Sequence, residues 1–163
     1  MPLFFLAAIF SLAADQLSKI WIRAQLPEGA RLEVWPGWIH LEHVRNFGAA
    51  WGVLSGQKWL LIAFTLVVVG VIAASAREVV ARGKLAATGF GLILGGAVGN
   101  LIDRIVFGHV TDFFDLDTPW PVLQTFPVFN IADSALTVGV VLMLLSMFLT
   151  RPNPQSAIRN PQS

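Results

Sequence analysis

Two aspartates in the second half of the chain could form a paired-carboxylate site, and the apolar neighbours of Asp112 make its charged form costly. Asp112 lies in the motif V-T-D-F-F and Asp133 in the motif F-N-I-A-D-S. Burial among apolar side chains raises the pKa of a carboxyl group, and two adjacent carboxylates tend to share one proton. One member can then activate a water as general base, while the protonated member polarises a carbonyl group. The pair therefore indicates paired-carboxylate hydrolysis of a peptide bond.

Asp133 also has a simpler interpretation. Asn130 lies three residues before it, which resembles a capping box at the start of a helix. The local sequence leaves the two interpretations equally supported. Topology favours the pair, because one apolar span ends shortly before Asp112 and the next begins near Asp133. Both acids are thus expected at similar depth on one face of the membrane, with Asp112 in a loop just outside the span.

Other polar residues interrupt the apolar spans, where ionisable groups suggest a functional site by default. Asp15 and Lys19 are four residues apart with the acid first, the favourable order for an ion pair on one helix. We expect this pair to be structural. Asn100, Asp103 and Arg104 are expected to share one helical face, either as a clamp between helices or as a substrate contact.

Several other chemistries are excluded or disfavoured. The chain has no cysteine, which removes thiolate nucleophiles, disulfides and cysteine-based metal sites. G-x-S-x-G, H-E-x-x-H and Walker motifs are absent. His40 and His43 are three residues apart on an expected strand and so point to opposite faces, which does not predict a metal site. A net charge of +1 argues against nucleic acid as a partner. We expect neither a metal nor a cofactor.

The elements that must position these residues are membrane spans. The chain is 55% hydrophobic and 13% charged, about half the charge of an average soluble domain. Apolar stretches at about 2–21, 59–76, 85–106 and 131–149 are each long enough to cross a bilayer. Gly95 and Gly99 give the third span a small-residue face for close helix packing. We therefore predict an all-α membrane protein with four transmembrane helices, as a single domain over residues 1–150.

The segments outside the spans, about 22–58 and 107–130, are expected on the outer side. Arg77, Arg82 and Lys84 lie between the second and third spans, so the positive-inside rule makes that side and both termini cytoplasmic. Six tryptophans fall at or beyond the outer span ends, as expected for the membrane interface. Alternation at 31–35 and 38–44, with Pro36-Gly37 between them, predicts a small β-sheet at the outer surface. Residues 151–163 are expected to form a disordered cytoplasmic tail.

Five motifs, in this order, resemble those of the lipoprotein signal peptidases, also called signal peptidase II. They are D-Q-L-S-K from Asp15, N-F-G-A-A-W-G from Asn46, the stretch Gly95–Arg104, V-T-D-F from Val110 and F-N-I-A-D-S from Phe129. Together they cover nearly the whole chain apart from the tail. Trp51 departs from the family pattern, in which Phe is more usual.

The resemblance implies that Asp112 and Asp133 are the catalytic pair. It also implies roles in supporting the site or binding substrate for Asn46, Gly48, Asn100, Asp103, Arg104 and Asn130, beside the polar pair Asp15 and Lys19. The implied substrate is a bacterial prolipoprotein, cut just before a diacylglyceryl-modified cysteine in the cell (inner) membrane. We expect membrane lipids as further partners and a monomeric enzyme, with the active site near the extracytoplasmic face. The tryptophan-rich outer segment could then cover the scissile bond.

A second class of function uses the same residues differently. A small proton-coupled transporter or channel subunit also places acids in its spans. Both key acids are expected at one face rather than along a path through the bilayer, and no inverted repeat is detectable. These two features favour the peptidase.

Overall fold

The computed structural model describes residues 1–49 and 52–149, so Trp51 and the predicted tail at 151–163 lie outside the described residues. Within that part, four helices are long and apolar enough to cross a membrane, which confirms the predicted spans. They are α1 (Pro2–Gln25), α2 (Lys58–Ala81), α3 (Lys84–Val106) and α5 (Ile131–Leu149). α1 and α2 continue past their expected ends at about residues 21 and 76. In α1 the added turn buries Ile22, which is 1% exposed.

α3 is the central helix of the bundle and packs against α1, α2 and α5. Its close packing depends on glycine. A Cβ added to Gly99 would lie 2.5 Å from Asp15 Oδ2 on α1, and one added to Gly96 would lie 2.6 Å from the carbonyl oxygen of Ala132 on α5. Gly95 likewise leaves no room for a Cβ beside Ser11. The predicted small-residue face of Gly95 and Gly99 is confirmed, and it brings α1 against the polar half of α3.

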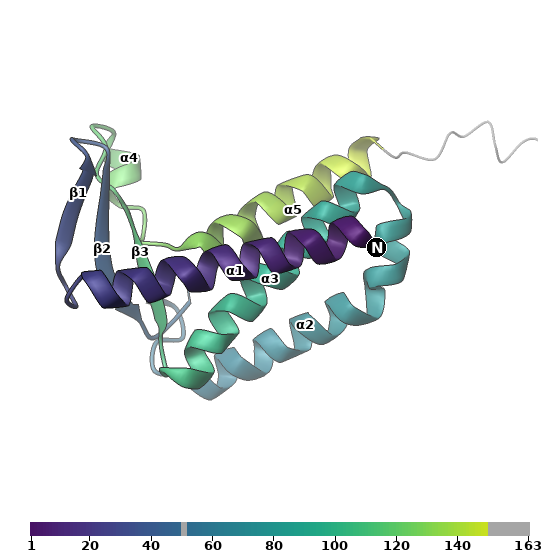
Figure 1. Cartoon of the computed structure of the whole chain (residues 1–163), viewed down its shortest axis with the longest axis horizontal. Helices are drawn as coiled ribbons and strands as arrows, with labels where there is room; N and C mark the ends of the chain where they lie inside the picture. Colours follow the sequence, from purple (N-terminus) through teal and green to yellow (C-terminus); the bar gives the residue numbers. More distant parts are fainter. Residues whose placement is uncertain (50–51, 150–163) are drawn as a thin grey trace, which may run out of the picture.

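α2 packs mainly against α3, and toward the sheet end of the molecule it diverges from α1 and α5 while its start stays beside the end of α3 (Figure 1). Much of its surface is apolar and exposed, including Phe64, Val67 and Val71. Such a surface suits contact with lipid hydrocarbon, where apolar side chains have no cost of exposure. The α2 side of the bundle is therefore more open than the side formed by α1, α3 and α5.

A three-stranded antiparallel sheet lies across one end of the bundle, opposite the N-terminus and the last turn of α5 (Figure 1). Its order is β1 (Arg31–Trp35), β2 (Ile39–Asn46), β3 (Val110–Leu116). The predicted small sheet is confirmed, with β1 as expected and β2 extended to Asn46. A short helix, α4 (Pro121–Gln124), follows β3.

The prediction of a loop around Asp112 is wrong, because residues Val110–Leu116 form β3. Residues Val110 to Phe113 are all buried, so the strand lacks the polar–apolar alternation that reveals a half-buried strand. Its pairing with β2 sets Asp112 opposite Val44 and Val110 opposite Asn46. A strand held by a sheet fixes the Asp112 backbone more firmly than a loop would.

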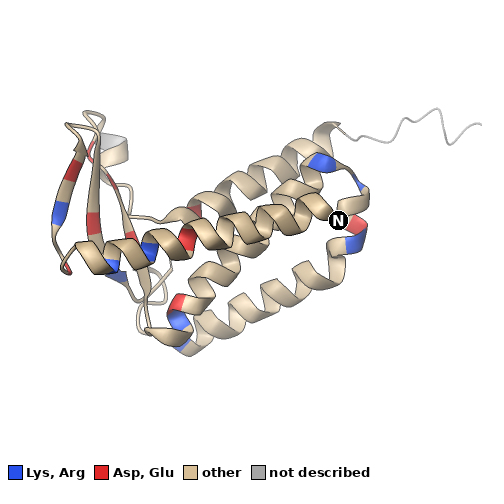
Figure 2. Ribbon diagram, in the orientation of Figure 1, with Lys and Arg blue, Asp and Glu red and all other residues tan. Residues whose placement is uncertain are grey.

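Charged residues gather in the sheet half of the molecule and at the turn between α2 and α3 (Figure 2). The rest of each helix is almost uniformly uncharged. Candidate functional residues therefore lie at one end of the bundle, where the sheet meets α1, α3 and α5.

Candidate active site

Asp112 is held by two amide groups from different elements. Its side chain is on β3, and the residue is 2% exposed. Asn46 Nδ2, at the end of β2, donates a hydrogen bond to Asp112 Oδ2 at 2.9 Å, and Asn130 Nδ2 donates to Oδ1 at 2.6 Å. Each carboxyl oxygen therefore has its own N–H donor, which fixes the orientation of the carboxyl group.

Asp133 lies in the first turn of α5 and forms a capping box with Asn130. The Asn130 backbone N–H donates to Asp133 Oδ2 at 3.2 Å, and the Asp133 backbone N–H donates to Asn130 Oδ1 at 2.9 Å. The capping interpretation of this motif is correct. It does not compete with a chemical role, because Asp133 Oδ1 faces the other way and accepts a bond of 2.9 Å from Asn100 Nδ2.

Asn130 links the two aspartates and is fully buried. Its single side chain caps α5 at Asp133 through Oδ1 and binds Asp112 through Nδ2. The same Nδ2 also lies 3.1 Å from Asn100 Oδ1. β3, α3 and the start of α5 are thus joined by one continuous set of amide and carboxylate groups.

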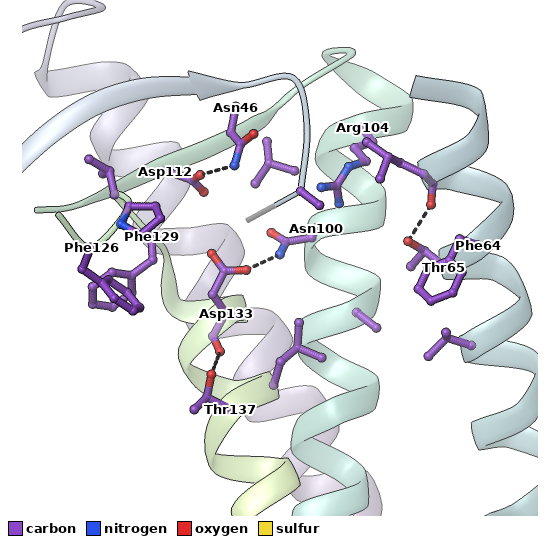
Figure 3. A pocket seen from close by; sticks show the side chains of 18 residues that line it. Asn46, Phe64, Thr65, Asn100, Arg104, Asp112, Phe126, Phe129, Asp133 and Thr137 are labelled. Atoms are coloured by element: carbon purple, nitrogen blue, oxygen red, sulfur yellow. Dashed lines mark hydrogen bonds between the residues drawn. The ribbon is translucent and has the colours of Figure 1, made fainter. Parts of the chain in front are cut away.

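Asp112 and Asp133 line the same cavity, whose volume is about 470 Å³ (Figure 3). Asn46, Asn100 and Arg104 supply further polar side chains, which lie with the two acids at one end of the cavity. The remaining wall is largely apolar. Most of it comes from α2, α5 and the segment before α5: Leu61, Phe64, Thr65, Val68, Phe126, Pro127, Val128, Phe129, Leu136 and Thr137. Ala49, Ala97 and Val110 complete it. An apolar cavity with a few convergent polar groups is typical of a ligand or substrate site.

The electrostatic environment of Asp112 favours its protonated form. Burial, followed by the negative charge of Asp133, raises the pKa of Asp112 to about 7. Hydrogen bonds from Asn46 and Asn130 and the positive charge of Lys19 act in the opposite direction. Asp112 can therefore carry a proton close to neutral pH, as one member of a carboxyl pair that shares a proton must.

A buried ion cluster, formed by Asp15, Lys19, Arg23 and Asp103, lies beside the aspartates. Lys19 Nζ is 2.9 Å from Asp15 Oδ2 and 3.4 Å from Asp103 Oδ2, and all three side chains are 0% exposed. Arg23 Nη1 lies 3.6 Å from Asp103 Oδ1. The ion pair expected within α1 thus exists, but it belongs to a larger cluster that joins α1 to α3.

The three polar residues expected on one face of α3 divide between two directions. Asn100 and Arg104 line the cavity, whereas Asp103 faces the buried ion cluster and accepts a hydrogen bond from the Thr111 backbone N–H at 3.0 Å. Adjacent helix positions differ by 100°, so Asp103 and Arg104 reach different neighbours. Asn100 lies between these two directions, because it lines the cavity with Arg104 and also accepts a hydrogen bond from Lys19, the partner of Asp103. Asp103 is a clamp between elements.

The backbone of Gly48 binds a residue that lines the cavity. Arg104 Nη2 donates to the Gly48 carbonyl oxygen at 2.8 Å. A Cβ on Gly48 would come 2.8 Å from the carbonyl oxygen of Val53, so the loop after β2 closes only around glycine. Gly48 therefore holds Arg104 at the cavity without contributing a side chain.

Sequence reasoning did not identify Arg23 or the α2 wall of the cavity. Arg23 Nη1 donates to Thr111 Oγ1 at 2.9 Å and so ties α1 to the strand that carries Asp112. Thr65 is the one hydroxyl residue in the apolar run from Trp59 to Val69, and it lines the cavity. This hydroxyl residue within an apolar run was the sequence signal that could have identified the α2 wall. Arg23 offered none, since a basic residue at a span end is common.

Three comparisons with known proteins agree on one family. A family model described as Signal peptidase (SPase) II matches residues 7–149. A lipoprotein signal peptidase of Listeria monocytogenes is 42% identical over 147 residues, covering 90% of this chain and 93% of the relative. One from Gloeobacter violaceus is 45% identical over 145 residues, covering 88% and 80%. A bacterial membrane enzyme solved by the in meso method at 2.3 Å superposes with a TM-score of 0.82 at 29% identity, covering 100% and 94%.

Fold, site and relatives define a multi-pass bacterial membrane protease. The chain belongs to the signal peptidase II family, as its five motifs predicted. The transporter or channel alternative finds no support, because the matching family is a peptidase family and the polar residues converge on one cavity at one end of the bundle.

Proposed function

We propose that the chain is an aspartic endopeptidase that removes signal peptides from diacylglyceryl-modified prolipoproteins, with Asp112 and Asp133 as its catalytic pair. The observation that carries this proposal is the Asn130 side chain, which binds Asp112 and caps Asp133 at the wall of one cavity. The relatives are named lipoprotein signal peptidases, which supports the substrate class. The chemistry uses no metal or cofactor.

In the proposed mechanism Asp133 is the general base and Asp112 is the general acid. Asp133 removes a proton from a water whose oxygen attacks the scissile carbonyl carbon, and Asp112 gives its proton to the carbonyl oxygen. The resulting diol collapses as the C–N bond breaks. The leaving nitrogen takes the proton from Asp133, and a diol hydroxyl returns a proton to Asp112. The pKa of Asp112 near 7 supports its role as the acid.

The apolar cavity wall supports a lipid-bearing substrate that arrives sideways through the membrane. Leu61 and Val68 of α2 and Leu136 of α5 all line the cavity, while α2 packs mainly on α3. A chain in the bilayer can therefore reach the aspartates between α2 and α5 without crossing water. Asn46, Asn100 and Arg104 are positioned to contact the peptide backbone. Gly48, Asp103, Asn130 and the pair Asp15–Lys19 support them.

We place the active site near the extracytoplasmic face, with the sheet outside and both termini in the cytoplasm. Arg77, Arg82 and Lys84 at the opposite end support this orientation by the positive-inside rule. In the part of the chain that the structure describes, Trp35, Trp59 and Trp120 at the sheet end are each at least 60% exposed, as interfacial indoles would be. One chain supplies every group of the proposed site, which supports a monomer.

The experiment uses purified full-length protein with a diacylglyceryl-modified precursor and its unmodified form. We expect cleavage of the first only. Asp112→Asn and Asp133→Asn should each reduce turnover by roughly a thousandfold while the protein stays folded and inserted. Asp117→Asn, at an exposed position after β3, is the matched control and should retain activity. Equal cleavage of both precursors would refute the substrate class, and an active Asp112→Asn or Asp133→Asn protein would refute the catalytic pair.

A further inference from the structure

The Lys19 ammonium has three partners and no contact with solvent. They are Asp15 Oδ2 at 2.9 Å, Asp103 Oδ2 at 3.4 Å and Asn100 Oδ1 at 2.8 Å. An ammonium group has three N–H donors and no acceptor. All of its donors are therefore used, and only an oxygen can face it.

This requirement fixes the amide of Asn100. Asn100 Oδ1 accepts from Lys19 Nζ and, at 3.1 Å, from Asn130 Nδ2. Asn100 Nδ2 must then face Asp133 Oδ1, to which it donates at 2.9 Å (Figure 3). Turning the amide over would set its NH₂ against the ammonium and its carbonyl oxygen against a carboxylate. Lys19 thus determines that Asp133 meets a donor.

The acids paired with Lys19 also hold the backbone next to each aspartate. Asp15 Oδ1 accepts from the Ala132 backbone N–H at 2.9 Å, and Asp103 Oδ2 accepts from the Thr111 backbone N–H at 3.0 Å. Ala132 immediately precedes Asp133, and Thr111 immediately precedes Asp112. The buried ion cluster is therefore hydrogen-bonded to the residue that precedes each member of the proposed catalytic pair.

We propose that Lys19 is a positioning residue for peptide hydrolysis, because its hold on the Asn100 amide keeps an N–H donor on Asp133 Oδ1 and so holds the Asp133 carboxyl group in the orientation that a general base needs. A donor fixed on one carboxyl oxygen sets the orientation of the whole carboxyl group. The charged groups around this arrangement are Asp15 and Arg23 on α1, Asp103 and Arg104 on α3, Asp112 on β3 and Asp133 on α5. The inference rests on the proposed function and adds a role for a residue remote from the substrate.

Lys19→Met alone would leave two buried acids without their shared cation and could prevent folding. The test variant is therefore Lys19→Met combined with Asp15→Asn, which removes one charge of each sign and leaves an oxygen to accept from Ala132. Asp15→Asn alone is its reference, and Lys84→Met at the far end of α3 is the matched lysine control. Asn100→Leu removes the amide itself. Melting temperature in detergent, kcat and KM are measured for each with a diacylglyceryl-modified precursor.

We expect the charge-balanced double variant to melt near the native protein, with KM unchanged and kcat reduced about 30-fold, the size of one hydrogen bond to a charged group. Asn100→Leu should lose kcat similarly. Adding the double change to Asn100→Leu should cost less than about threefold more, since both act through one amide. Because the Lys19 charge lowers the pKa of Asp112, its removal should also move the alkaline limb of the pH profile upward. A purely structural cluster predicts neither effect.

Three outcomes would each overturn the role of Lys19. The folded double variant could keep the native kcat, or it could lose no more kcat than Asp15→Asn alone. Its loss of kcat could also add to that of Asn100→Leu. Failure of the double variant to fold leaves the Asn100→Leu protein as the deciding case, and near-native kcat in that protein also overturns the inference. If the native protein itself does not cleave the modified precursor, the proposed function fails first. The two failures are therefore distinguishable.

Discussion

Asn130 and Asp133 bind each other twice across the first turn of α5, with bonds of 3.2 Å and 2.9 Å between each backbone N–H and the other's side chain. The cap uses the backbone N–H and the side-chain Oδ1 of Asn130, so its side-chain Nδ2 can donate to Asp112. A helix cap and a proposed catalytic contact thus share one side chain, and substitution can separate the two functions.

Asn130→Ala should lose both, and Asn130→Ser should lose only the contact with Asp112. Serine can cap α5, because its hydroxyl accepts from the Asp133 N–H, but it has no NH₂ group for Asp112. We expect Asn130→Ala to be destabilised by about 1 kcal/mol and Asn130→Ser to melt near the native temperature. Both should lose about 100-fold in kcat/KM. Full activity in Asn130→Ser would show that the contact between Asn130 and Asp112 has no catalytic importance.

Activity should fall as pH rises through about 7. Above the pKa of Asp112, raised to about 7 by burial and by Asp133, the pair loses its shared proton and with it the general acid. We expect kcat/KM to decrease about tenfold per pH unit on that limb, measured from pH 5 to 9. A plateau that extends to pH 9 would contradict the assignment.

The same titration has a consequence for folding. The pKa of Asp112 is higher in the folded protein than its ordinary value of 3.8. Its stabilising contribution is therefore complete below that ordinary value and is lost as pH rises through about 7. Asp112→Asn removes this term, so its melting temperature should decline less between pH 4 and 7 than that of the native protein.

The close contact between α1 and α3 can be tested at Gly99. A methyl group there would lie 2.5 Å from Asp15 Oδ2 in the buried ion cluster, so we expect Gly99→Ala to cost about 1–3 kcal/mol of unfolding free energy and to reduce activity. Gly70→Ala on α2 is the matched control, because a Cβ there meets nothing within 4 Å. Equal melting temperatures for the two variants would contradict the packing argument.

Two neighbouring valines on α2 can distinguish the cavity from the lipid-facing surface by substitution. Val68 lines the cavity, and Val67 is 64% exposed. Val68→Trp should fill part of the space and lower kcat/KM for the diacylglyceryl-modified precursor by about tenfold, whereas Val67→Trp should have no effect. Both are assayed with the same precursor in the same detergent. Identical kinetics for the two would show that substrate does not enter beside α2.

The sequence predicted the membrane spans well because each is a property of contiguous residues. About twenty apolar residues in a row need no knowledge of the partner helix. The spacing of Gly95 and Gly99 predicted close packing for the same reason. The five motifs also predicted the supporting residues, because residues that contact one another in the fold recur together in a family pattern.

The directions of individual polar side chains could not be predicted locally. Asp103 and Arg104 are adjacent in the chain, yet one enters the buried ion cluster and the other the cavity. β3 was missed because its pairing partner, β2, lies more than sixty residues earlier. Arg23 and the α2 wall depend on how α1 and α2 dock on α3. Each of these facts requires the relative placement of elements distant in sequence.

The pairing of Asp15 with Lys19 within one helix also affects how the chain enters the bilayer. Asp103 and Asn100, the other partners of Lys19, are more than eighty residues further along and are synthesised much later. Until then α1 carries its own counter-ion four residues away, so it can wait in the membrane with nearly balanced charge. Because α1 is synthesised first, we expect an acid within α1 to neutralise Lys19 during insertion, which an acid on α3 alone could not do.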